Sequence, residues 1–535
     1  MNFKKPIKFE TEFNKKKLII ETGRVARNAD AAVWLQYGKL VLLSIVSINH
    51  SKKSDSSYVP LSVTYLEKDY AKGLITGNYT KRETPQTIPQ ILYSRLIDRP
   101  IRPLFPSLYR NETVVDVILL SNDPTIPPDT MIITAASLAL GLSSAPYTKQ
   151  IAGIKICKTN DGLIVNPDYN NLKNSEFQIM VAGTKDAITM IECEANNADN
   201  SEIVESLNLA QKHINQLINI QEEFINKFSN IPKIQTLEDI ENSAFFQGLI
   251  KLHNTQILEI ANIVNLEKRK EEIDIFLKTL QLSFDTIHSK IADTAQYQQY
   301  DPNEILKSFK YTILRNCILN GYREDGRKTD ELRQIECSVG LLPAADGSAL
   351  FTRGDTQSLG IVTIGPERND ANFSDIDKSY FLHYNFPPFS VGDCQRKTSV
   401  SRREYGHGIL AEKSLKAIMP YIKNFKRNIR IVSEILESNG SSSMASVCAA
   451  SLALKNAGVP ISALAAGISI GLISENNKNI LISDIQGAED HFGDMDFKIA
   501  GTRDGITGLQ LDIKLNGINI EILAQALELA EINRL

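Results

Sequence analysis

The chain has 535 residues, of which 42% are hydrophobic and 23% charged, a length that suits about three to four globular domains. Its 59 basic and 63 acidic residues give a net charge of −4, which excludes a global basic field and requires any polyanion site to be local. The six cysteines are scattered without metal-ligand spacing, which predicts reduced thiols. There is no secretory leader and no apolar run long enough for a membrane, so we expect a cytoplasmic protein with no membrane partner.

The first part of the chain predicts strands followed by a helix. From Lys17 to Ile48 apolar and polar residues alternate, with a polar break at Gln36–Lys39, which is typical of strands joined by hairpin turns. The alanine-rich run Asp129–Gly141 favours a helix. Strands followed by a long helix packed on them indicate an α+β unit.

The middle of the chain, residues 202–319, has a different texture. It is rich in Leu, Ile, Glu, Lys and Gln, and stretches such as Ile203–Phe228 and Leu266–Leu282 show helical spacing of their apolar residues. Pro232 and the pair Asp301-Pro302 predict breaks between helices. We expect an all-helical domain whose charged residues form a solvated face.

The last third repeats the pattern of the first. The sequence AASLAL occurs at Ala135–Leu140 and Ala449–Leu454, which are 314 positions apart, and AGTKDAIT at Ala182–Thr189 matches AGTRDGIT at Ala500–Thr507 with an offset of 318. Two echoes in nearly the same register indicate a duplicated fold. The expected domains are therefore 1–201, 202–319 and 320–535, with two similar α+β units around the helical one.

The two copies differ in the charged residues just before the second echo. The second copy carries Asp490, Asp494, Asp496 and Lys498, whereas the aligned positions of the first copy include Leu172, Gln178 and Met180. The second copy is thus the better candidate for chemistry.

A run of three serines, Ser441–Ser443, follows Asn439-Gly440 where the second alanine-rich helix is expected to begin. Backbone N–H groups at a helix N-terminus and three hydroxyls could converge on one anion such as phosphate. The alternative is ordinary capping, for which one serine is enough. The aligned residues of the first copy are Pro127, Pro128 and Asp129, and a carboxylate there would repel phosphate.

Asp490 and Asp496 are candidate metal ligands. If Met495–Ile499 forms a strand, Asp496 and Lys498 lie on one face, and Gly493 allows a turn that brings Asp490 close. Two carboxylates with room for water and phosphate suit Mg²⁺, and Lys498 could hold phosphate oxygens. An exposed acidic turn is the alternative.

Two further groups of basic residues could contact phosphodiesters. Arg402 and Arg403 precede His407 in a glycine-containing segment, where two guanidiniums suit bidentate contacts and the imidazole could orient a phosphate. In the first copy, candidates for RNA contact are Lys81, Arg82, Arg95, Arg99 and Arg102. Spacings of three and four residues would place the last three on one helical face, although Asp98 could instead pair with Arg102.

Several long motifs together resemble the bacterial polynucleotide phosphorylases. They are RLIDRPIRPLFP, GYREDGRKTDELRQIE, FLHYNFPPFSVG, RREYGHG, SEILESNGSSSMASVCAASLAL and EDHFGDMDFKIAGTRDGITGLQLDIK. The resemblance spans nearly the whole chain. It implies two tandem domains of the RNase PH type joined by a helical domain, with the second core active and the first guiding RNA.

The resemblance also implies a function. That function is phosphate-dependent 3′→5′ degradation of single-stranded RNA to nucleoside diphosphates, which is reversible as template-independent polymerisation and serves mRNA degradation. It implies Mg²⁺, for which Mn²⁺ can substitute, on Asp490 and Asp496, a homotrimer, and association with an RNA-degradation complex. Hydrolytic cleavage and an RNA-binding scaffold of little activity are the alternatives.

Three features depart from the pattern of that family. The first-core loop reads Tyr79-Thr80-Lys81-Arg82, with one aromatic residue to stack on a base where the family usually has two. The loop 393–401 is more polar than is usual. The chain reaches Leu535 about where the family continues into KH and OB-type modules, so we expect either a truncation or a natural loss.

Overall fold

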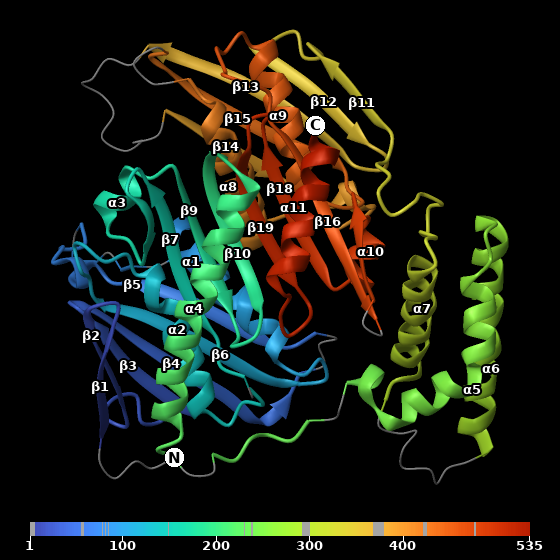
Figure 1. Cartoon of the computed structure of the whole chain (residues 1–535), viewed down its shortest axis with the longest axis horizontal. Helices are drawn as coiled ribbons and strands as arrows, with labels where there is room; N and C mark the ends of the chain where they lie inside the picture. Colours follow the sequence, from blue (N-terminus) through green and yellow to red (C-terminus); the bar gives the residue numbers. More distant parts are fainter. Residues whose placement is uncertain are drawn as a thin grey trace.

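The computed structural model describes residues 6–54, 58–77, 79–80, 82–83, 85–147, 149–228, 231–236, 239–290, 300–367, 379–420, 425–475 and 478–535. Two α+β cores lie against each other, and a group of helices lies to one side of them (Figure 1). The α+β class with two similar cores and a helical part, expected from the repeat, is confirmed.

The first core opens with a six-stranded sheet. Its strand order is β1-β2-β3-β4-β6-β5, antiparallel except for the last pair. Its strands are β1 Ile7–Phe13, β2 Lys16–Thr22, β3 Ala31–Tyr37, β4 Leu40–Lys53, β5 Leu61–Glu67 and β6 Asn111–Ser121. Helices α1 (Ile88–Ile101) and α2 (Asp129–Leu142) pack on it, and the strands expected between Lys17 and Ile48 are confirmed.

The second core repeats this arrangement with five strands. Their order is β11-β12-β13-β15-β14, and again the last pair is parallel. The strands are β11 Ile335–Val339, β12 Gly347–Arg353, β13 Gln357–Glu367, β14 Tyr380–Asn385 and β15 Arg427–Glu437. Helices α8 (Arg402–Leu415) and α9 (Ser442–Asn456) correspond to α1 and α2.

An eight-stranded sheet joins the two cores. Its order is β17-β16-β18-β19-β10-β9-β7-β8. The strands are β7 Ala152–Thr159, β8 Gly162–Val165, β9 Phe177–Gly183, β10 Ile188–Ala198, β16 Ala466–Glu475, β17 Lys478–Ser483, β18 Met495–Gly501 and β19 Ile506–Ile513. Strands β10 and β19 pair antiparallel, with Cys193 opposite Leu509. The two copies therefore share one hydrogen-bonded sheet and the hydrophobic cluster along it, while the five-stranded sheet of the second core has clusters of its own.

The helices between the two cores differ in what they pack against. Helix α4 (Asn200–Ile225) buries Ile203, Leu207 and Ile214 in the core of the eight-stranded sheet, so it belongs to the first core. The separate helical unit consists of α5 (Ala244–Ala261), α6 (Leu266–Lys290) and α7 (Pro302–Leu319), which share a second hydrophobic cluster.

That second cluster also includes residues of the second core, among them Ile473, Ile482 and Phe492. Helix α7 packs on β16 and β17 there. The remaining helices are α3 Tyr169–Lys173, α10 Gly487–Phe492 and α11 Ile520–Arg534, with 3₁₀ turns at Asp69–Lys72, Arg102–Leu104, Ile240–Asn242, Pro388–Val391 and Lys416–Ile418. Among the described residues, no helix combines the length and apolar character that crossing a membrane requires.

Candidate active site

The segment Asn439–Ser443, here called the serine loop, follows β15 and includes the first two residues of α9. Ser441 has a φ of +41°, in the left-handed region, and its side chain makes no capping hydrogen bond to the helix. The hydroxyl oxygens of Ser441 and Ser443 are buried without a hydrogen-bond partner among the described residues. Ordinary capping therefore does not account for the three serines, and two buried donors remain available to an anion.

Ser442 is held by a tyrosine that the sequence did not single out. The hydroxyl of Tyr384, on β14, lies 2.7 Å from Oγ of Ser442 and 3.4 Å from Nδ1 of His407. The tyrosine and histidine rings meet edge to face with centroids 5.4 Å apart. Tyr384 thus fixes the positions of one serine and of His407 together.

His407 lies inside α8, not at its start, so it does not cap the helix. Burial lowers the pKa of His407 well below its ordinary value, and the positive charges of Lys498, Arg403 and Arg95 lower it further. The imidazole is therefore neutral near pH 7. The same three cations place positive charge around the imidazole.

The two arginines at the start of α8 point to different neighbours. Arg403 lines a cavity of about 310 Å³ together with Tyr384, Glu404 and His407. Arg402 instead donates to the carbonyl of Val63 and to Gln86, each at 2.8 Å, in the first core. The geometry supports a substrate role for Arg403 and gives Arg402 a contact between the cores.

The predicted carboxylate cluster lies at the turn from α10 to β18. Asp496 and Lys498 share one face of β18, as expected, and Lys498 Nζ lies 2.5 Å from Asp496 Oδ2. Asp490 is on α10, and burial raises its pKa, with the negative charge of Asp496 raising it further. Asp494 faces elsewhere, because Arg315 of α7 binds both of its oxygens at 2.9 Å.

These residues fit a divalent cation of the hard type. The repulsion between Asp490 and Asp496 is the electrostatic condition that a bound cation relieves, and carboxylate oxygens are the ligands that Mg²⁺ prefers. The described residues contain no group of three or more Asp, Glu, His or Cys suited to a metal. A cation here would thus depend on two carboxylates and on substrate or water oxygens.

The first-core arginines differ from the expected row of RNA-binding cations. Arg99 pairs with Glu192 and Asp512 and donates to the carbonyl of Leu511, so its guanidinium is used within the protein. Arg102 pairs with Asp98 at 2.6 Å, the alternative considered above, and donates to two carbonyls of the first core. The geometry therefore gives no support for RNA contact by these two residues.

Arg95 and the loop residues remain candidates. Arg95 reaches the second core, where a Cβ on Gly406 would meet its Nε at 2.4 Å, so the absence of a side chain at Gly406 makes room for it. Tyr79 is 93% exposed, and Arg82 donates to its carbonyl. Lys81 lies outside the described residues.

Comparisons with known proteins identify the family. The sequence profile of the 3' exoribonuclease family, domain 1, matches residues 14–146 and 331–460, and that of domain 2 matches residues 149–213. A polyribonucleotide nucleotidyltransferase of Thermosipho melanesiensis is 43% identical over 98% of this chain and 76% of its own length. The chain belongs to the polyribonucleotide nucleotidyltransferase family.

Another family member, from Fervidobacterium nodosum, is 44% identical over 95% of this chain and 74% of its own length. Among solved structures, rice (Oryza sativa) Rrp46 aligns with 40% of this chain and 94% of its own, at 20% identity and a TM-score of 0.33, too slight a likeness to carry an argument. The polyribonucleotide nucleotidyltransferase assignment depends on the matches that cover nearly the whole of this chain.

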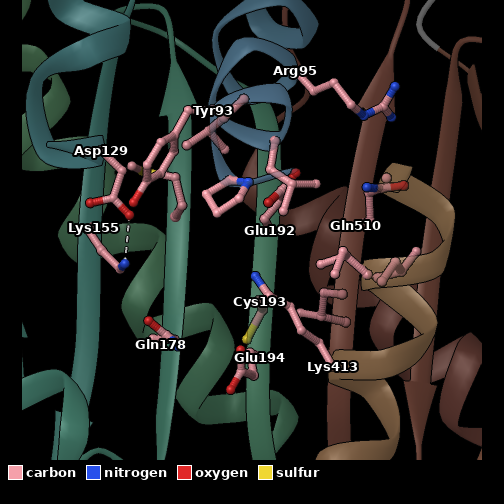
Figure 2. Close-up of a pocket in the computed structure, with 18 residues that line it drawn as sticks. Tyr93, Arg95, Asp129, Lys155, Gln178, Glu192, Cys193, Glu194, Lys413 and Gln510 are labelled. Carbon is pink, nitrogen blue, oxygen red and sulfur yellow. Dashed lines mark hydrogen bonds and ion pairs between the residues drawn. The ribbon is translucent and has the colours of Figure 1, made fainter. Parts of the chain in front are cut away.

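A cavity of about 310 Å³ lies between the cores (Figure 2). It is the counterpart, in the first copy, of the candidate site of the second copy. Gln178 and Met180, the counterparts of Asp496 and Lys498, line it. Asp129, the counterpart of the last serine, pairs there with Lys155 at 2.7 Å. In the first copy the carboxylate of Asp129 thus lies where the second copy presents serine hydroxyls to an anion. The positions that match Asp490 and Asp496 hold no carboxylate there.

Sequence reasoning missed two residues of the second site, Tyr384 and Asp512. Tyr384 lies within FLHYNFPPFSVG, a motif noticed only as part of the resemblance. Asp512 is 3.6 Å from Lys498, and Arg99 and Lys498 keep the pKa of its carboxyl below the ordinary value. Its only sequence signal was its position in the last motif.

Proposed function

We propose that the second core of this phosphorolytic 3′→5′ exoribonuclease and RNA polymerase binds inorganic phosphate on the serine loop. The observation that carries this assignment is the pair of buried hydroxyls, on Ser441 and Ser443, that have no partner among the described residues. They lie at the N-terminus of a 15-residue helix, where backbone N–H groups and the helix dipole add to the attraction for an anion.

In the degradative direction a phosphate oxygen attacks the last phosphorus of the RNA. A new P–O bond forms, the bond from that phosphorus to the preceding 3′ oxygen breaks, and this oxygen leaves with the electron pair and takes up a proton. The products are a nucleoside diphosphate and an RNA shorter by one nucleotide. RNA and phosphate are the only reactants. The reverse reaction at the same site therefore makes RNA from nucleoside diphosphates and releases phosphate.

The residues of the site act by placing and neutralising charge. Arg403 and Lys498 stabilise negative charge on the phosphates, and neutral His407 offers a hydrogen bond beside them. Tyr384 keeps Ser442 and His407 in place. Asp490 and Asp496 would hold Mg²⁺, or Mn²⁺ in its place, which would supply further neutralisation of charge in the site.

We assign to the first core a role in guiding RNA without cutting it. Arg95, Tyr79 and Arg82, with Lys81, are the residues proposed to contact the strand. The homotrimer, the RNA-degradation complex, the role in mRNA degradation and the cytoplasmic location are parts of the same proposal, and six unpaired cysteines agree with a reducing compartment.

Hydrolysis and an inactive scaffold are the competing functions. A hydrolase has no use for a second anion site beside the carboxylates, and a scaffold needs neither. The deciding experiment incubates the chain with poly(A) and Mg²⁺, with and without phosphate, and identifies the product. ADP formed only with phosphate supports the proposal. AMP formed without phosphate would indicate hydrolysis, and no product would indicate a scaffold.

A further inference from the structure

Asp484 is a buried carboxylate surrounded by arginines next to the serine loop. It follows β17, has no exposed side-chain surface and has a φ of +49°. Arg333 binds it in a fork at 2.7 and 2.9 Å, and Arg353 Nε lies 2.8 Å from it. Arg327 completes the cluster at 3.3 Å. Arg327 has a carboxylate partner of its own, Asp325, at 2.6 Å, so Arg333 and Arg353 around Asp484 leave a net positive charge.

The same arginines bind the backbone of the serine loop. Arg333 donates to the carbonyl of Asn439 at 2.6 Å, and Arg353 donates to the carbonyls of Gly440 and Ser441, each at 3.3 Å. Three consecutive carbonyls of the loop therefore turn toward the arginine cluster. None of the described contacts of these arginines involves the three serine hydroxyls, so the hydroxyls stay available.

This arrangement explains why the loop adopts an unfavourable backbone conformation. A left-handed φ at Ser441 is costly for a residue with a Cβ and persists only where surrounding contacts impose it. Gly440, with a φ of +105°, has no room for a side chain, because a Cβ would meet the carbonyl oxygen of Ile485 at 2.2 Å. The arginines thus hold the carbonyls of the loop, and the backbone of Ile485 leaves no room for a side chain at Gly440.

We propose that Arg353, with Arg333 and Asp484, positions the serine loop for phosphate and places fixed positive charge behind it. The inference depends on the proposed role of Ser441–Ser443 in binding phosphate. Arg353 is a positioning residue, because it acts through the loop backbone and is only 2% exposed. It also gives a role to the segment GYREDGRKTDELRQIE, which supplies Arg327 and Arg333 and had no function in the sequence reasoning.

Arg353→Met removes the charge and both carbonyl contacts, whereas Arg353→Lys keeps the charge without the planar fork. The matched control is Arg534→Met, which removes a partly buried guanidinium of the second core, one that donates to the carbonyls of Thr502 and Gly505 in a different turn. The double variant Ser441→Ala/Ser443→Ala removes the two unpartnered hydroxyls and tests the serine loop itself. Each protein is assayed as the full chain with poly(A) and Mg²⁺.

The measurement is the phosphate concentration that gives half-maximal rate, compared with kcat and with the Kd for a single-stranded RNA. We expect Arg353→Met to raise the half-saturating phosphate concentration about tenfold or more, as loss of charge-assisted contacts does. Arg353→Lys should recover part of that loss, Arg534→Met should not change the phosphate dependence, and the RNA Kd should change little in all of them.

The outcomes separate this inference from the proposed function. If the serine variant raises the phosphate requirement and Arg353→Met does not, the positioning role is wrong and the phosphate site stands. If the serine variant leaves the requirement unchanged, the phosphate site itself is wrong. Should Arg353→Met fail to fold, the shift of Tm with added phosphate is compared between wild type and Arg353→Lys, and an equal shift in both overturns the positioning role.

Discussion

Arg99 Nε lies 2.6 Å from Oδ1 of Asp512, and this ion pair joins α1 of the first core to β19 of the second. The guanidinium also pairs with Glu192 and donates to the carbonyl of Leu511 at 2.9 Å. Asp512 in turn lies 3.6 Å from Lys498. A cation of the first core therefore helps to fix the strand that lies beside Lys498.

Replacing Arg99 by Met should destabilise the protein. Removing one member of a buried charge cluster leaves its partners unpaired and costs about 3–5 kcal/mol. We expect a loss near the lower end of that range, because the side chains of Glu192 and Asp512 are 33% and 37% exposed. Urea unfolding of the variant measures it.

The control for this change is Lys8→Met, which breaks a surface pair with Glu10 and should cost less than about 1 kcal/mol. An Arg99→Met variant as stable as wild type, with weaker RNA binding only, would contradict the structural role and return Arg99 to the RNA-binding residues.

Asp496→Asn should impair degradation and polymerisation alike, because both directions pass through one transition state. The substitution keeps the shape of the side chain and removes the charge that pairs with Lys498 and is proposed to bind Mg²⁺. Removing one such electrostatic contact typically costs about 10²–10³ in kcat. Release of phosphate from ADP and release of ADP from poly(A) are the two rates to compare.

Asp504→Asn, in the exposed turn after β18, serves as the control for Asp496→Asn and should keep both rates. Near-normal activity of the Asp496 variant in Mg²⁺ would remove the metal assignment. Loss of one direction alone would contradict a shared site.

Local features of the second core could be predicted from the sequence because they depend on near neighbours. The alternation that places Asp496 and Lys498 on one face is a property of any strand, and it holds in β18. The serine run at the start of α9 follows from a Gly turn before an alanine-rich helix. Both could be found without knowing the rest of the fold.

Contacts between the copies could not be predicted in this way. Arg95 and Arg99 lie on α1, as their spacing indicated, but nothing near them in sequence names Asp512 as a partner, 413 residues away from Arg99. The pairing of β10 with β19 could not be predicted for the same reason. Alternation of apolar residues shows which face of a strand is buried, but not which strand lies beside it. The amphipathic pattern of helix α4 likewise does not show which neighbours the helix packs against.

His407 should make the protein less stable in mild acid. Its pKa in the folded state lies well below the ordinary value of 6.5, so below about pH 6.5 the unfolded chain binds a proton that the folded protein does not. Stability from this group is therefore complete above that pH and falls as the pH drops, by up to about 1.4 kcal/mol per pH unit.

The check is urea unfolding of wild type and His407→Gln at about pH 7 and pH 5.5, in buffers without phosphate. The variant should lose less stability than wild type between these two pH values, because its side chain does not titrate. Equal losses in the two proteins would mean that the imidazole ionises in place, and the neutral role assigned to it in the site would then be wrong.

The last prediction separates the two cores by their RNA contacts. Tyr79 is almost fully exposed and Arg82 lies beside it, and the sequence places Lys81 in the same loop. Replacing Lys81 and Arg82 by Gln should weaken binding of long RNA and flatten its salt dependence. Each phosphate contact contributes about 0.7 to the slope of log K against log salt for single strands, so two lost contacts should reduce the slope by about 1.4.

Turnover of a saturating short oligonucleotide should change little in this double variant, because that substrate fits within the second core alone. The matched control is Lys8→Gln with Lys17→Gln, which removes two exposed cations of the first core that pair with Glu10 and should leave the salt slope as it is. If the loop variant instead lost turnover on short substrates and kept the salt slope, the loop would be part of the catalytic site. The division of labour between the copies, with the first guiding RNA and the second cutting it, would then have to be abandoned.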